Sequence, residues 1–283
     1  MKKLLTFILA TALLCTCLFA TACNKEQAKL KIIDISLTSE EYAFVMAKDN
    51  TTLKTQFDAF LAEIESDGTF DTLLDKYFKG NGTKVGYDIS DGDTANTDAN
   101  LVVVTNTPFE PFEYTDKGKI YGLDIEIAGL FAQKHGLTLV IKNIDFDAIF
   151  SQVENGYADI GMAGITISPD RLELYSFSTA YYNASQKLIV AADNTDFDAC
   201  ETVADVEAIL SSLSGKKIGY QNGTTGGMYV DGNEDWGYDG FDNIEGVGYK
   251  TAQLAAQDII NGNIYAVVVD DAPAAAIVEA MNN

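Results

Sequence analysis

The chain has 283 residues, of which 47% are hydrophobic, and it carries a formal net charge of −23 at pH 7. So acidic a surface repels the phosphate backbone of nucleic acids, and no basic cluster offsets it, so we expect no nucleic-acid partner. The length is sufficient for two hydrophobic cores of ordinary size.

The chain begins with a segment that reads as an export signal. Lys2 and Lys3 precede an apolar run over residues 4–19, which is the usual order in a signal peptide. The run is too short for a comfortable transmembrane span. We therefore predict that residues 1–22 are a signal peptide that is removed from the mature protein.

Small residues lead to the first cysteine of the mature chain. Residues 20–22 precede Cys23 in a pattern typical of lipoprotein signals, so we predict that Cys23 is lipidated and that residues 23–28 form a tether. The alternative is a plain secretory signal with an incidental cysteine. Cys200 would then have no partner, and no spacing of Cys and His indicates a metal site, so we expect neither a disulfide nor a cofactor.

Two helices and a linker are predicted between residues 51 and 100. Residues 51–65 place five apolar side chains at helical spacing, which predicts an amphipathic helix. These side chains are Leu53, Phe57, Phe60, Leu61 and Ile64. After an Asp-Gly break, Thr69 or Asp71 would cap a second short helix that ends at Phe78. Residues 79–100 are rich in Gly, Asp, Asn and Thr, which is a linker composition.

Strands and helices alternate from residue 101 onward, which predicts an α/β fold with mostly parallel sheets flanked by helices. The predicted strands are residues 101–105, 137–142, 159–162, 217–220 and 266–269. The predicted helices are residues 123–134, 147–155, 202–213, 252–261 and 273–281. Two extended segments, residues 42–47 and 187–191, would cross between two lobes as a two-strand hinge.

Three segments carry a resemblance to a known family. Residues 29–50 read KLKIIDISLTSEEYAFVMAKDN and residues 66–78 read SDGTFDTLLDKYF, and both resemble the end of a family 3 extracellular solute-binding protein of a polar amino-acid ABC importer. Residues 101–133, LVVVTNTPFEPFEYTDKGKIYGLDIEIAGLFAQ, resemble the beginning of such a protein. The resemblance covers residues 29–78 and 100–283, and it implies a two-lobed, periplasmic-binding-protein-like type II fold.

The order of these segments implies a circular permutation. The chain stops where family members continue into the segment found here at the front, and nothing is missing or repeated. Residues 29–41 and 192–283 would form lobe 2, residues 48–78 and 101–186 would form lobe 1, and the linker would join the original termini. The alternative is that residues 28–78 form a separate small domain beside a truncated binding protein.

The resemblance places half of a binding site in residues 160–171, IGMAGITISPDR. It implies that Arg171 forms a two-pronged bond to a ligand carboxylate, a geometry that lysine cannot reproduce. The carbonyl of Gly164, next to Ala163, would receive the ligand ammonium, and Thr166 would offer a hydroxyl and an N–H group. The alternative is that Arg171 is a solvated residue after a turn.

The other half would lie in residues 216–230, KKIGYQNGTTGGMYV, a predicted strand, turn and helix start that includes Gln221. The unpaired N–H groups at a helix start favour an anion. Thr224 and Thr225 resemble the family pair that holds the same carboxylate from the opposite lobe. Without a ligand, the same pattern describes a simple capped turn.

Four further positions complete the expected site. Asp270 follows an apolar run and resembles the carboxylate that pairs with the ligand ammonium, although the adjacent Asp271 leaves the assignment open. Phe109 and Phe146 stand where family members enclose the aliphatic part of the ligand. Asn106 stands where several members that bind basic or amide ligands carry Asp, which weakens the case for a cationic ligand.

A calcium loop is a weaker possibility. Asp231, Asn233 and Asp235 match the opening of such a loop, but Trp236 replaces the required Gly and Asp242 stands where a bidentate Glu belongs. We favour a turn-rich loop, and we expect no metal.

The resemblance implies a monomeric lipoprotein without a cofactor, held at the outer face of the bacterial cytoplasmic membrane. It would capture a free L-amino acid, polar and uncharged, by lobe closure and deliver it to an ABC permease. One alternative is an enzyme on the same fold, a dehydratase of prephenate or arogenate, although no nucleophile–base pair is visible. Another is a sensory binding module, which fold analogy does not exclude.

Overall fold

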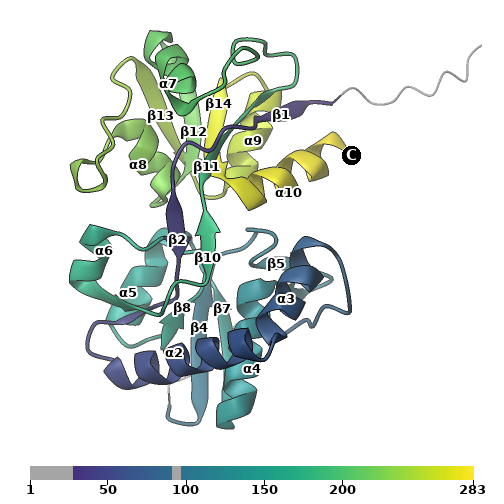
Figure 1. Ribbon diagram of the computed structural model, residues 1–283, viewed down its shortest axis with the longest axis vertical. Coiled ribbons are helices and arrows are strands. Elements are labelled where there is room, and N and C mark those ends of the chain that lie inside the picture. Colours follow the sequence, from purple (N-terminus) through teal and green to yellow (C-terminus); the bar gives the residue numbers. More distant parts are fainter. Residues whose placement is uncertain (1–27, 91–96) are drawn as a thin grey trace, which may run out of the picture.

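The computed structural model describes residues 28–90 and 97–283 and folds them into two lobes, lobe 1 below and lobe 2 above in Figure 1. The predicted signal peptide, Cys23 and part of the predicted linker lie outside the described residues. Across the described ranges, no helix combines the length and the apolar character that a bilayer span requires.

Lobe 1 is built on a sheet with the strand order β7-β4-β8-β3-β9. Its strands are β3 (Val45–Ala47), β4 (Asn100–Thr105), β7 (Thr138–Asn143), β8 (Ile160–Gly161) and β9 (Tyr175–Phe177). The flanking elements are α2 (Thr51–Ser66), α3 (Thr69–Phe78), α4 (Leu123–His135), η1 (Phe146–Ala148), α5 (Ile149–Glu154), α6 (Pro169–Leu174) and the hairpin of β5 (Tyr114–Asp116) and β6 (Lys119–Tyr121). Alternate residues of β4 pack into cores on opposite faces of the sheet, as a strand buried on both sides requires.

Lobe 2 repeats this plan with the strand order β1-β11-β14-β12-β13. Its strands are β1 (Leu30–Ile33), β11 (Gln186–Ala191), β12 (Lys216–Gln221), β13 (Ile244–Tyr249) and β14 (Ala266–Asp270). Its helices are α7 (Val203–Ser212), α8 (Thr225–Asp231), η2 (Glu234–Trp236), α9 (Ala252–Ile260) and α10 (Asp271–Asn282).

The predicted two-lobed α/β fold is present, but each sheet is more mixed than the strand–helix alternation indicated. In lobe 1, β4 runs parallel to β7 and β8, whereas β3 runs antiparallel to both of its neighbours. In lobe 2, β12 runs parallel to β13 and β14, whereas β11 runs antiparallel to β1 and β14. The antiparallel strands β3 and β11 lie directly beyond the chain segments that connect the lobes.

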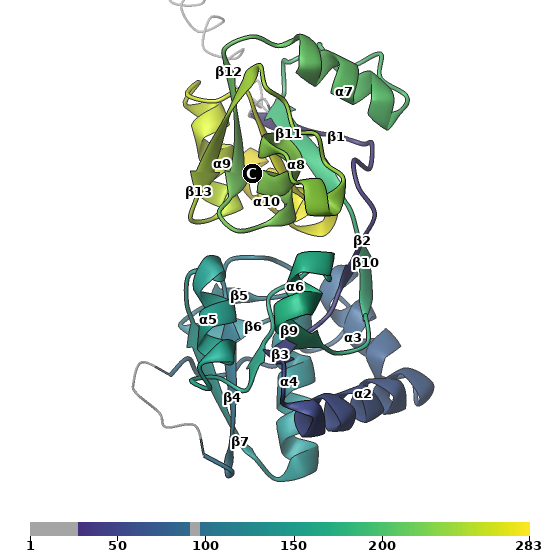
Figure 2. The ribbon, with the colours of Figure 1, turned by 90° about the vertical axis from the view of Figure 1, so that its left-hand side faces the viewer.

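The hinge lies a few residues before the predicted crossings. The ribbon between the lobes pairs β2 (Glu40–Tyr42) with β10 (Tyr182–Ala184) (Figure 2). The segments predicted to cross, residues 42–47 and 187–191, mostly belong to β3 and β11 inside the two sheets, so that part of the prediction is wrong. The reason is burial, because the apolar run of β11 is a central strand enclosed between β1 and β14.

The described part of the predicted linker, residues 79–100, includes a segment that packs against lobe 1. The backbones of Tyr87 and Ile120 exchange two hydrogen bonds, and Ser90 N donates to Ile141 O. Tyr87 and Ile89 pack against a small apolar cluster that includes Ile120 and Ile141. Two apolar residues in a polar segment are therefore enough to fix this end of the linker to the sheet edge.

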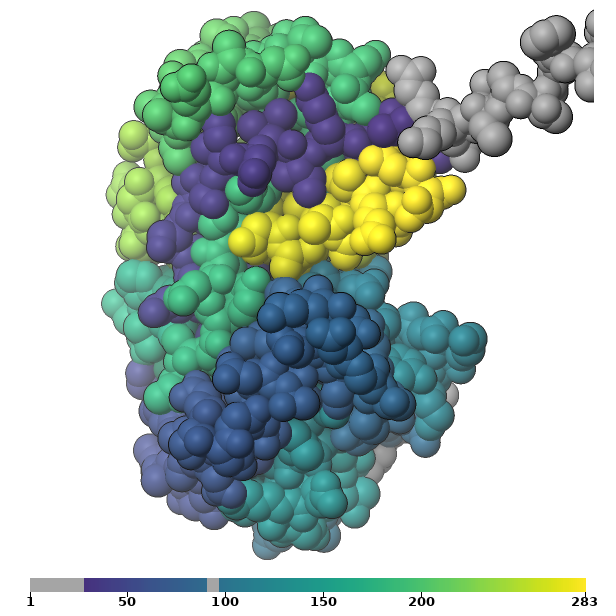
Figure 3. Space-filling view, turned by 45° about the vertical axis from the view of Figure 1, so that its right-hand side comes forward, coloured from purple at the N-terminus to yellow at the C-terminus, as the bar shows by residue number. Residues whose placement is uncertain are grey.

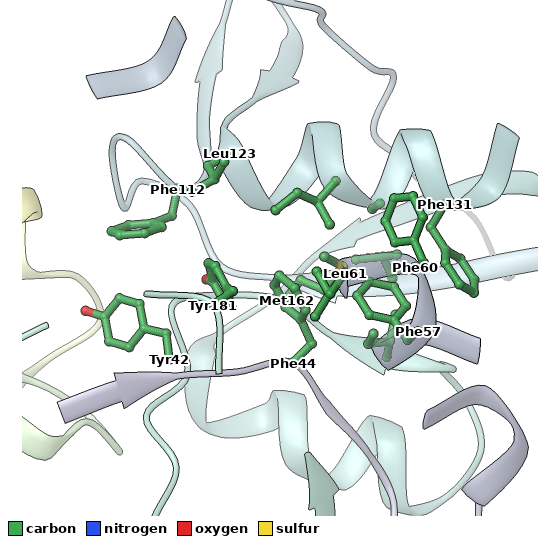
Figure 4. Packing of buried hydrophobic residues seen from close by; sticks show 14 of the residues in the cluster. Tyr42, Phe44, Phe57, Phe60, Leu61, Phe112, Leu123, Phe131, Met162 and Tyr181 are labelled. Atoms are coloured by element: carbon green, nitrogen blue, oxygen red, sulfur yellow. The ribbon is translucent and has the colours of Figure 1, made fainter. Parts of the chain in front are cut away.

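The largest core of lobe 1 is aromatic (Figure 4). Phe44 stacks on Tyr181 with ring centroids 4.4 Å apart, and Phe57 of α2 lies 4.6 Å from Phe131 of α4. The apolar stripe predicted for residues 51–65 is therefore buried against lobe 1. The predicted cap of the following helix is wrong, because the cap residue is Gly68 in the left-handed region, where φ is 81°.

The two ends of the described chain meet at the edge of lobe 2. Asn282, at the end of α10, accepts hydrogen bonds through Oδ1 from the backbone N–H groups of Lys29 and Leu30, at 2.8 and 3.0 Å. Its Nδ2 donates to the carbonyl oxygen of Leu30 at 2.9 Å. This one side chain therefore fixes β1 to the C-terminal helix.

We expect Asn282→Ala to lower the free energy of unfolding by about 1–2 kcal/mol, because three hydrogen bonds to β1 are lost at a partly exposed site. Urea unfolding followed by circular dichroism measures the difference. The matched control is Asn283→Ala, which removes an exposed amide one residue later and should change the stability little. Equal stability of the two variants would contradict the stabilising role of the Asn282 hydrogen bonds to β1.

Candidate functional site

A pocket lies between the lobes, and every predicted binding residue lines it. Lobe 1 contributes Asn106, Phe109, Phe146, Ala163, Gly164, Thr166 and Arg171, and lobe 2 contributes Gln221, Thr224, Thr225 and Asp270. Glu113 also lines the pocket and was not predicted. On the outside of the molecule, a groove between α10 and α3 separates the lobes on the face shown in Figure 3.

The sheet topology explains why residues so distant in sequence meet. Asn106 follows the carboxyl end of β4, Gln221 ends β12 and Asp270 ends β14. Parallel strands bring their carboxyl ends to the same edge of a sheet. The two lobes turn these edges toward each other, so each polar residue at a strand end faces the pocket.

Arg171, the only arginine in the chain, is buried with 6% of its surface exposed. Its Nη1 donates to the carbonyl oxygen of Thr166 at 2.8 Å, and its Nη2 donates to that of Gly223 in lobe 2 at 3.0 Å. The guanidinium also lies over the ring of Phe150, at 4.9 Å from its centroid. The alternative of a solvated Arg171 is therefore wrong.

Burial lowers the pKa of Arg171 to about 10, and the charges of Asp170, Glu40 and Asp270 oppose that shift. The guanidinium therefore stays protonated at neutral pH. A buried positive charge in a pocket is a strong attractor for an anionic group, since water screens it little.

Asp270 stands across the pocket as its acidic counterpart. It is 5% exposed, and its Oδ1 accepts from the hydroxyl of Tyr42 at 2.5 Å and from Nε2 of Gln186 at 2.9 Å. Burial, and then the charge of Glu40, raise the pKa of Asp270 well above its usual range. Asp271 instead accepts from the backbone of α10 and is absent from the pocket lining, so Asp270 is the carboxylate that faces the pocket.

The walls of the pocket include the two predicted aromatic rings. Phe109 and Phe146 are nearly buried, at 8% and 7% exposure. Gly164 has a φ of 53°, and a Cβ atom there would lie 2.5 Å from the ring of Phe109. Glycine is required at this position both by the backbone conformation and by the ring beside it.

Hydrogen bonds across the pocket hold the lobes in a closed arrangement. Besides the bond from Arg171 to Gly223, Gln221 Nε2 donates to Asn106 Oδ1 at 2.8 Å. At the rim, Trp236 Nε1 donates to Asp170 Oδ1 at 3.1 Å. An ion pair between Lys250 and Asp145, at 2.9 Å, lies at the surface.

The start of α8 differs from the expected anion site in its hydroxyl groups. Thr224 is the cap residue, but its hydroxyl donates to the carbonyl oxygen of Gln221 at 2.7 Å and does not cap the helix. The hydroxyl of Thr225 donates to Glu40 Oε2 at 2.8 Å. In this arrangement neither hydroxyl hydrogen points to a pocket anion.

Sequence reasoning missed the buried polar cluster behind the pocket, formed by Glu40, Tyr42 and Gln186. Strand β2 alternates between buried and exposed positions, with Glu40 and Tyr42 buried and Glu41 exposed. That alternation places an acidic residue on the inner face of a short strand, and it is the signal by which Glu40 could have been found.

The residues proposed for calcium are engaged in protein contacts. Asp231 accepts a hydrogen bond from Tyr220, and the side chain of Asn233 accepts from the backbone of Trp236 and so caps η2. Over the residues that the structure describes, no group of three or more His, Cys, Asp or Glu side chains is arranged to hold a metal ion.

Glu113 and Asp124 form a second buried acidic pair beside the pocket, both with 0% exposure. Tyr181 OH and the backbone N–H of Gly164 donate to Asp124, at 2.7 and 3.2 Å. Burial, and then the charge of Asp124, raise the pKa of Glu113 well above its usual range, whereas burial raises the pKa of Asp124 to about 7. Burial thus disfavours the charged form of both acids, and neither oxygen of Glu113 has a hydrogen-bond partner among the described residues.

Comparison with known proteins is consistent with this geometry. Residues 101–280 match the family of bacterial extracellular solute-binding proteins, family 3. The arginine-binding extracellular protein ArtP of Bacillus subtilis (strain 168) is 27% identical over 124 residues, which are 44% of this chain and 44% of that protein. The chain spans about half the length of the curated relatives it matches.

Solved structures are similar over a larger share. The holo form of ArgBP from T. maritima is 30% identical with a TM-score of 0.54, and the match covers 64% of this chain and 74% of that one. An ancestral amino acid-binding protein, described as a precursor of cyclohexadienyl dehydratase, is 27% identical with a TM-score of 0.55, and the match covers 64% of this chain and 75% of that one.

The acidic pair makes the stability of the protein depend on pH. Both pKa values are raised in the folded state, so the folded protein binds more protons than the unfolded chain between about pH 4 and pH 7, and stability falls as pH rises through that range. Glu113→Gln keeps the size of the side chain and prevents a buried charge from forming at this position. We expect this variant to be more stable than the wild type by about 1 kcal/mol at pH 8, and to show a flatter pH profile.

Thermal unfolding of the ligand-free protein from about pH 5 to pH 8 measures this profile. The control is Glu110→Gln, which neutralises an exposed acid three residues earlier and should leave the profile unchanged. Parallel pH profiles for wild type and Glu113→Gln would contradict the assignment.

Proposed function

Because the chain belongs to the bacterial extracellular solute-binding proteins of family 3, we propose that it captures a free L-amino acid between its two lobes and delivers it to an ABC permease. The observation that carries the proposal is the pairing of a buried guanidinium, Arg171, with a buried carboxylate, Asp270, in one interlobe pocket. An amino acid carries the two complementary charges at its α-carbon.

Binding would exchange contacts that now join the lobes. The ligand carboxylate would accept from Arg171, whose Nη2 now donates to the carbonyl oxygen of Gly223. The ligand ammonium would donate to Asp270, with Phe109 and Phe146 enclosing the aliphatic part. Neither lobe holds a complete site, so the closed state is favoured most when a ligand bridges both.

We propose a polar, uncharged side chain for the ligand. Asn106 and Gln221 meet at the pocket wall and offer amide donors and acceptors but no formal charge. Glu113, the remaining acid of that wall, is fully buried, and burial raises its pKa, which disfavours the charged form that a cationic side chain would require. ArtP and ArgBP are arginine-binding proteins by name, and the proposed specificity for a neutral side chain depends on the amide of Asn106.

We also propose the membrane attachment and the chain order that the sequence indicates. Residues 1–22 would be a signal peptide, and lipidated Cys23 would attach a monomeric protein to the outer face of the cytoplasmic membrane. The circular permutation is supported by β1, which pairs with β11 in lobe 2, and by α2, which packs on lobe 1. The lipid would then anchor lobe 2 and leave lobe 1 free to move.

A dehydratase that acts on prephenate or arogenate is the second candidate. The observation that favours it is Glu113, a fully buried carboxyl group in the pocket lining whose pKa is raised by burial, as suits a group that donates a proton to a leaving hydroxyl group. Incubation with prephenate and with arogenate, followed by detection of the aromatic product, separates the two functions. The binding proposal predicts no turnover.

A thermal-shift screen with the common L-amino acids tests the ligand class, since a ligand at a hundredfold excess over its Kd adds ~2.7 kcal/mol to the stability. For the amino acid that binds, Arg171→Ala should cost about 2–5 kcal/mol of affinity in calorimetry, because a desolvated two-pronged bond is lost. Arg171→Lys is the matched variant, because it keeps the positive charge but lacks the planar, two-pronged guanidinium. Its affinity should lie between those of the wild type and Arg171→Ala. A loss below about tenfold for Arg171→Ala would remove Arg171 from the site.

The specificity is tested by adding a charge. Asn106→Asp should shift the preference from neutral toward cationic amino acids, since it places an opposite charge within reach of the ligand side chain. Asn143→Asp is the control, because it adds the same charge at an exposed position nearby that is absent from the pocket lining. An arginine or lysine preference already present in the wild type would contradict the proposed ligand.

The chain order is tested by rearrangement. A chain in which residues 97–283 precede residues 28–79 restores the proposed original order, and it should fold and bind like the wild type because Asn282 and Leu30 are already in contact. Residues 97–283 alone lack β1, β2, β3, α2 and α3 and should fail to unfold cooperatively. Normal binding by this shorter chain would defeat the permutation and favour a separate N-terminal domain.

A further inference from the structure

Glu40 lies behind the pocket and accepts hydrogen bonds from four side chains. It is 4% exposed and stands at the start of the hinge strand β2. Its Oε2 accepts from Thr166 of lobe 1 at 2.7 Å and from Thr225 of lobe 2 at 2.8 Å. Its Oε1 accepts from Thr38 at 2.7 Å and from Gln186 Nε2 at 3.2 Å.

These contacts fix the direction of the two threonine hydroxyl groups that line the pocket. A carboxylate only accepts hydrogen bonds, so Thr166 and Thr225 each donate their single hydroxyl hydrogen to Glu40. Neither hydroxyl is then able to donate to an anion in the pocket. The hydroxyl oxygen of Thr166 retains lone-pair acceptor capacity for a ligand, and that of Thr225, which already accepts from Gln186 Nε2 at 2.9 Å, retains one further lone pair.

The orientation of Gln186 follows from the same rule. Its Nε2 lies 2.9 Å from Oδ1 of Asp270, 2.9 Å from the hydroxyl oxygen of Thr225 and 3.2 Å from Oε1 of Glu40. A flipped amide would place the amide oxygen against the two carboxyl oxygens, so the nitrogen occupies this position. The N–H groups of Gln186 are therefore directed at acceptors behind the pocket.

We call the side of the pocket formed by Asp270, Thr166 and Thr225, next to Glu40, its hinge end. This end consequently presents hydrogen-bond acceptors to the pocket. Oδ1 of Asp270 is occupied by Tyr42 and Gln186, and within the described ranges no other residue donates to Oδ2. Together with the hydroxyl oxygens of Thr166 and Thr225, this carboxyl oxygen can accept from a donor that brings several hydrogens and a positive charge. A primary ammonium group has three N–H donors and no acceptor.

We propose that Glu40 is a positioning residue that makes the hinge end of the pocket specific for a primary ammonium group. This inference rests on the proposed function and deepens it. Glu40 acts in two ways, by turning the hydroxyl groups of Thr166 and Thr225 into acceptors and by adding a second negative charge beside Asp270. The ligand carboxylate is then held by Arg171 and not by the threonine hydroxyl groups.

The charges support this division. Arg171 is the cation of the pocket lining, whereas Glu40 and Asp270 are two acids close enough to it to influence its pKa. A bound ammonium supplies the second positive charge that this group of residues lacks. Buried carboxylates without enough counter-charge are costly, which favours a cationic group at this end.

The test compares each amino acid with its desamino acid. The probes are the tightest binder among the common L-amino acids and the same molecule without the α-amino group, for example L-glutamine with glutaramic acid or L-arginine with 5-guanidinopentanoic acid. In Glu40→Gln, the amide is able to donate to one threonine and the second negative charge is gone. The Kd ratio is the Kd of the desamino acid divided by the Kd of the amino acid. We expect this ratio to fall by at least about tenfold in Glu40→Gln, mainly because the amino acid binds more weakly.

Glu41→Gln is the matched control, since it neutralises the exposed neighbour and should leave the ratio unchanged. Equal weakening of both probes in Glu40→Gln would mean that Glu40 only supports the fold, and it would overturn the inference. Should Glu40→Gln fail to fold, Thr166→Val and Thr225→Val replace it. If the threonine hydroxyl groups accept from the ligand ammonium, these variants lower the Kd ratio. If the hydroxyl groups donate to the ligand carboxylate, the variants weaken the binding of both probes equally, and the inference is overturned.

Failure of the proposed function has a different signature. A wild type that binds no amino acid of the panel overturns both the function and the role of Glu40. A wild type that binds an amino acid, with a Kd ratio unchanged by Glu40→Gln, overturns the role of Glu40 alone and leaves the function standing.

Discussion

The arrangement of the two lobes depends on one buried carboxylate in the hinge. Glu40 accepts hydrogen bonds from hydroxyl groups of both lobes, Thr166 of lobe 1 and Thr225 of lobe 2, so it holds the two lobes together next to the ribbon that connects them. The cluster lies on the short ribbon of β2 and β10, which has few residues with which to resist shear. A buried polar group that is fully paired rigidifies its surroundings, and this one does so at the base of the pocket.

Much of the fold could be predicted from the sequence because its elements have strong periodicity. The apolar stripe of α2 and the apolar runs of β4 and β14 indicate their structures without tertiary context. The pocket lining could be predicted because the resemblance to the family implies roles for Arg171, which lies in α6, and for Asp270, which ends β14. Arg171 is also the only arginine in the chain, which is a further indication in the sequence that this residue has a special role.

The remainder depends on tertiary contacts that no local pattern reveals. The hinge was misplaced because the apolar run of β11 suits both a crossing and a central strand, and only its neighbours β1 and β14 decide between them. The pairing of Glu113 with Asp124 joins two segments whose sequences each look like ordinary turn and helix starts. Likewise, the linker is held by Tyr87, a single aromatic residue in a stretch of polar composition.

The rim contact of Trp236 has an experimental consequence. It is the only tryptophan in the chain, and its indole N–H reaches across the cleft to Asp170 in the opposite lobe. Separation of the lobes would break that bond and transfer the ring to water. The protein therefore carries its own fluorophore at the contact between the lobes, and the opening and closing that the proposed function requires would be measurable by stopped-flow emission on the unlabelled molecule.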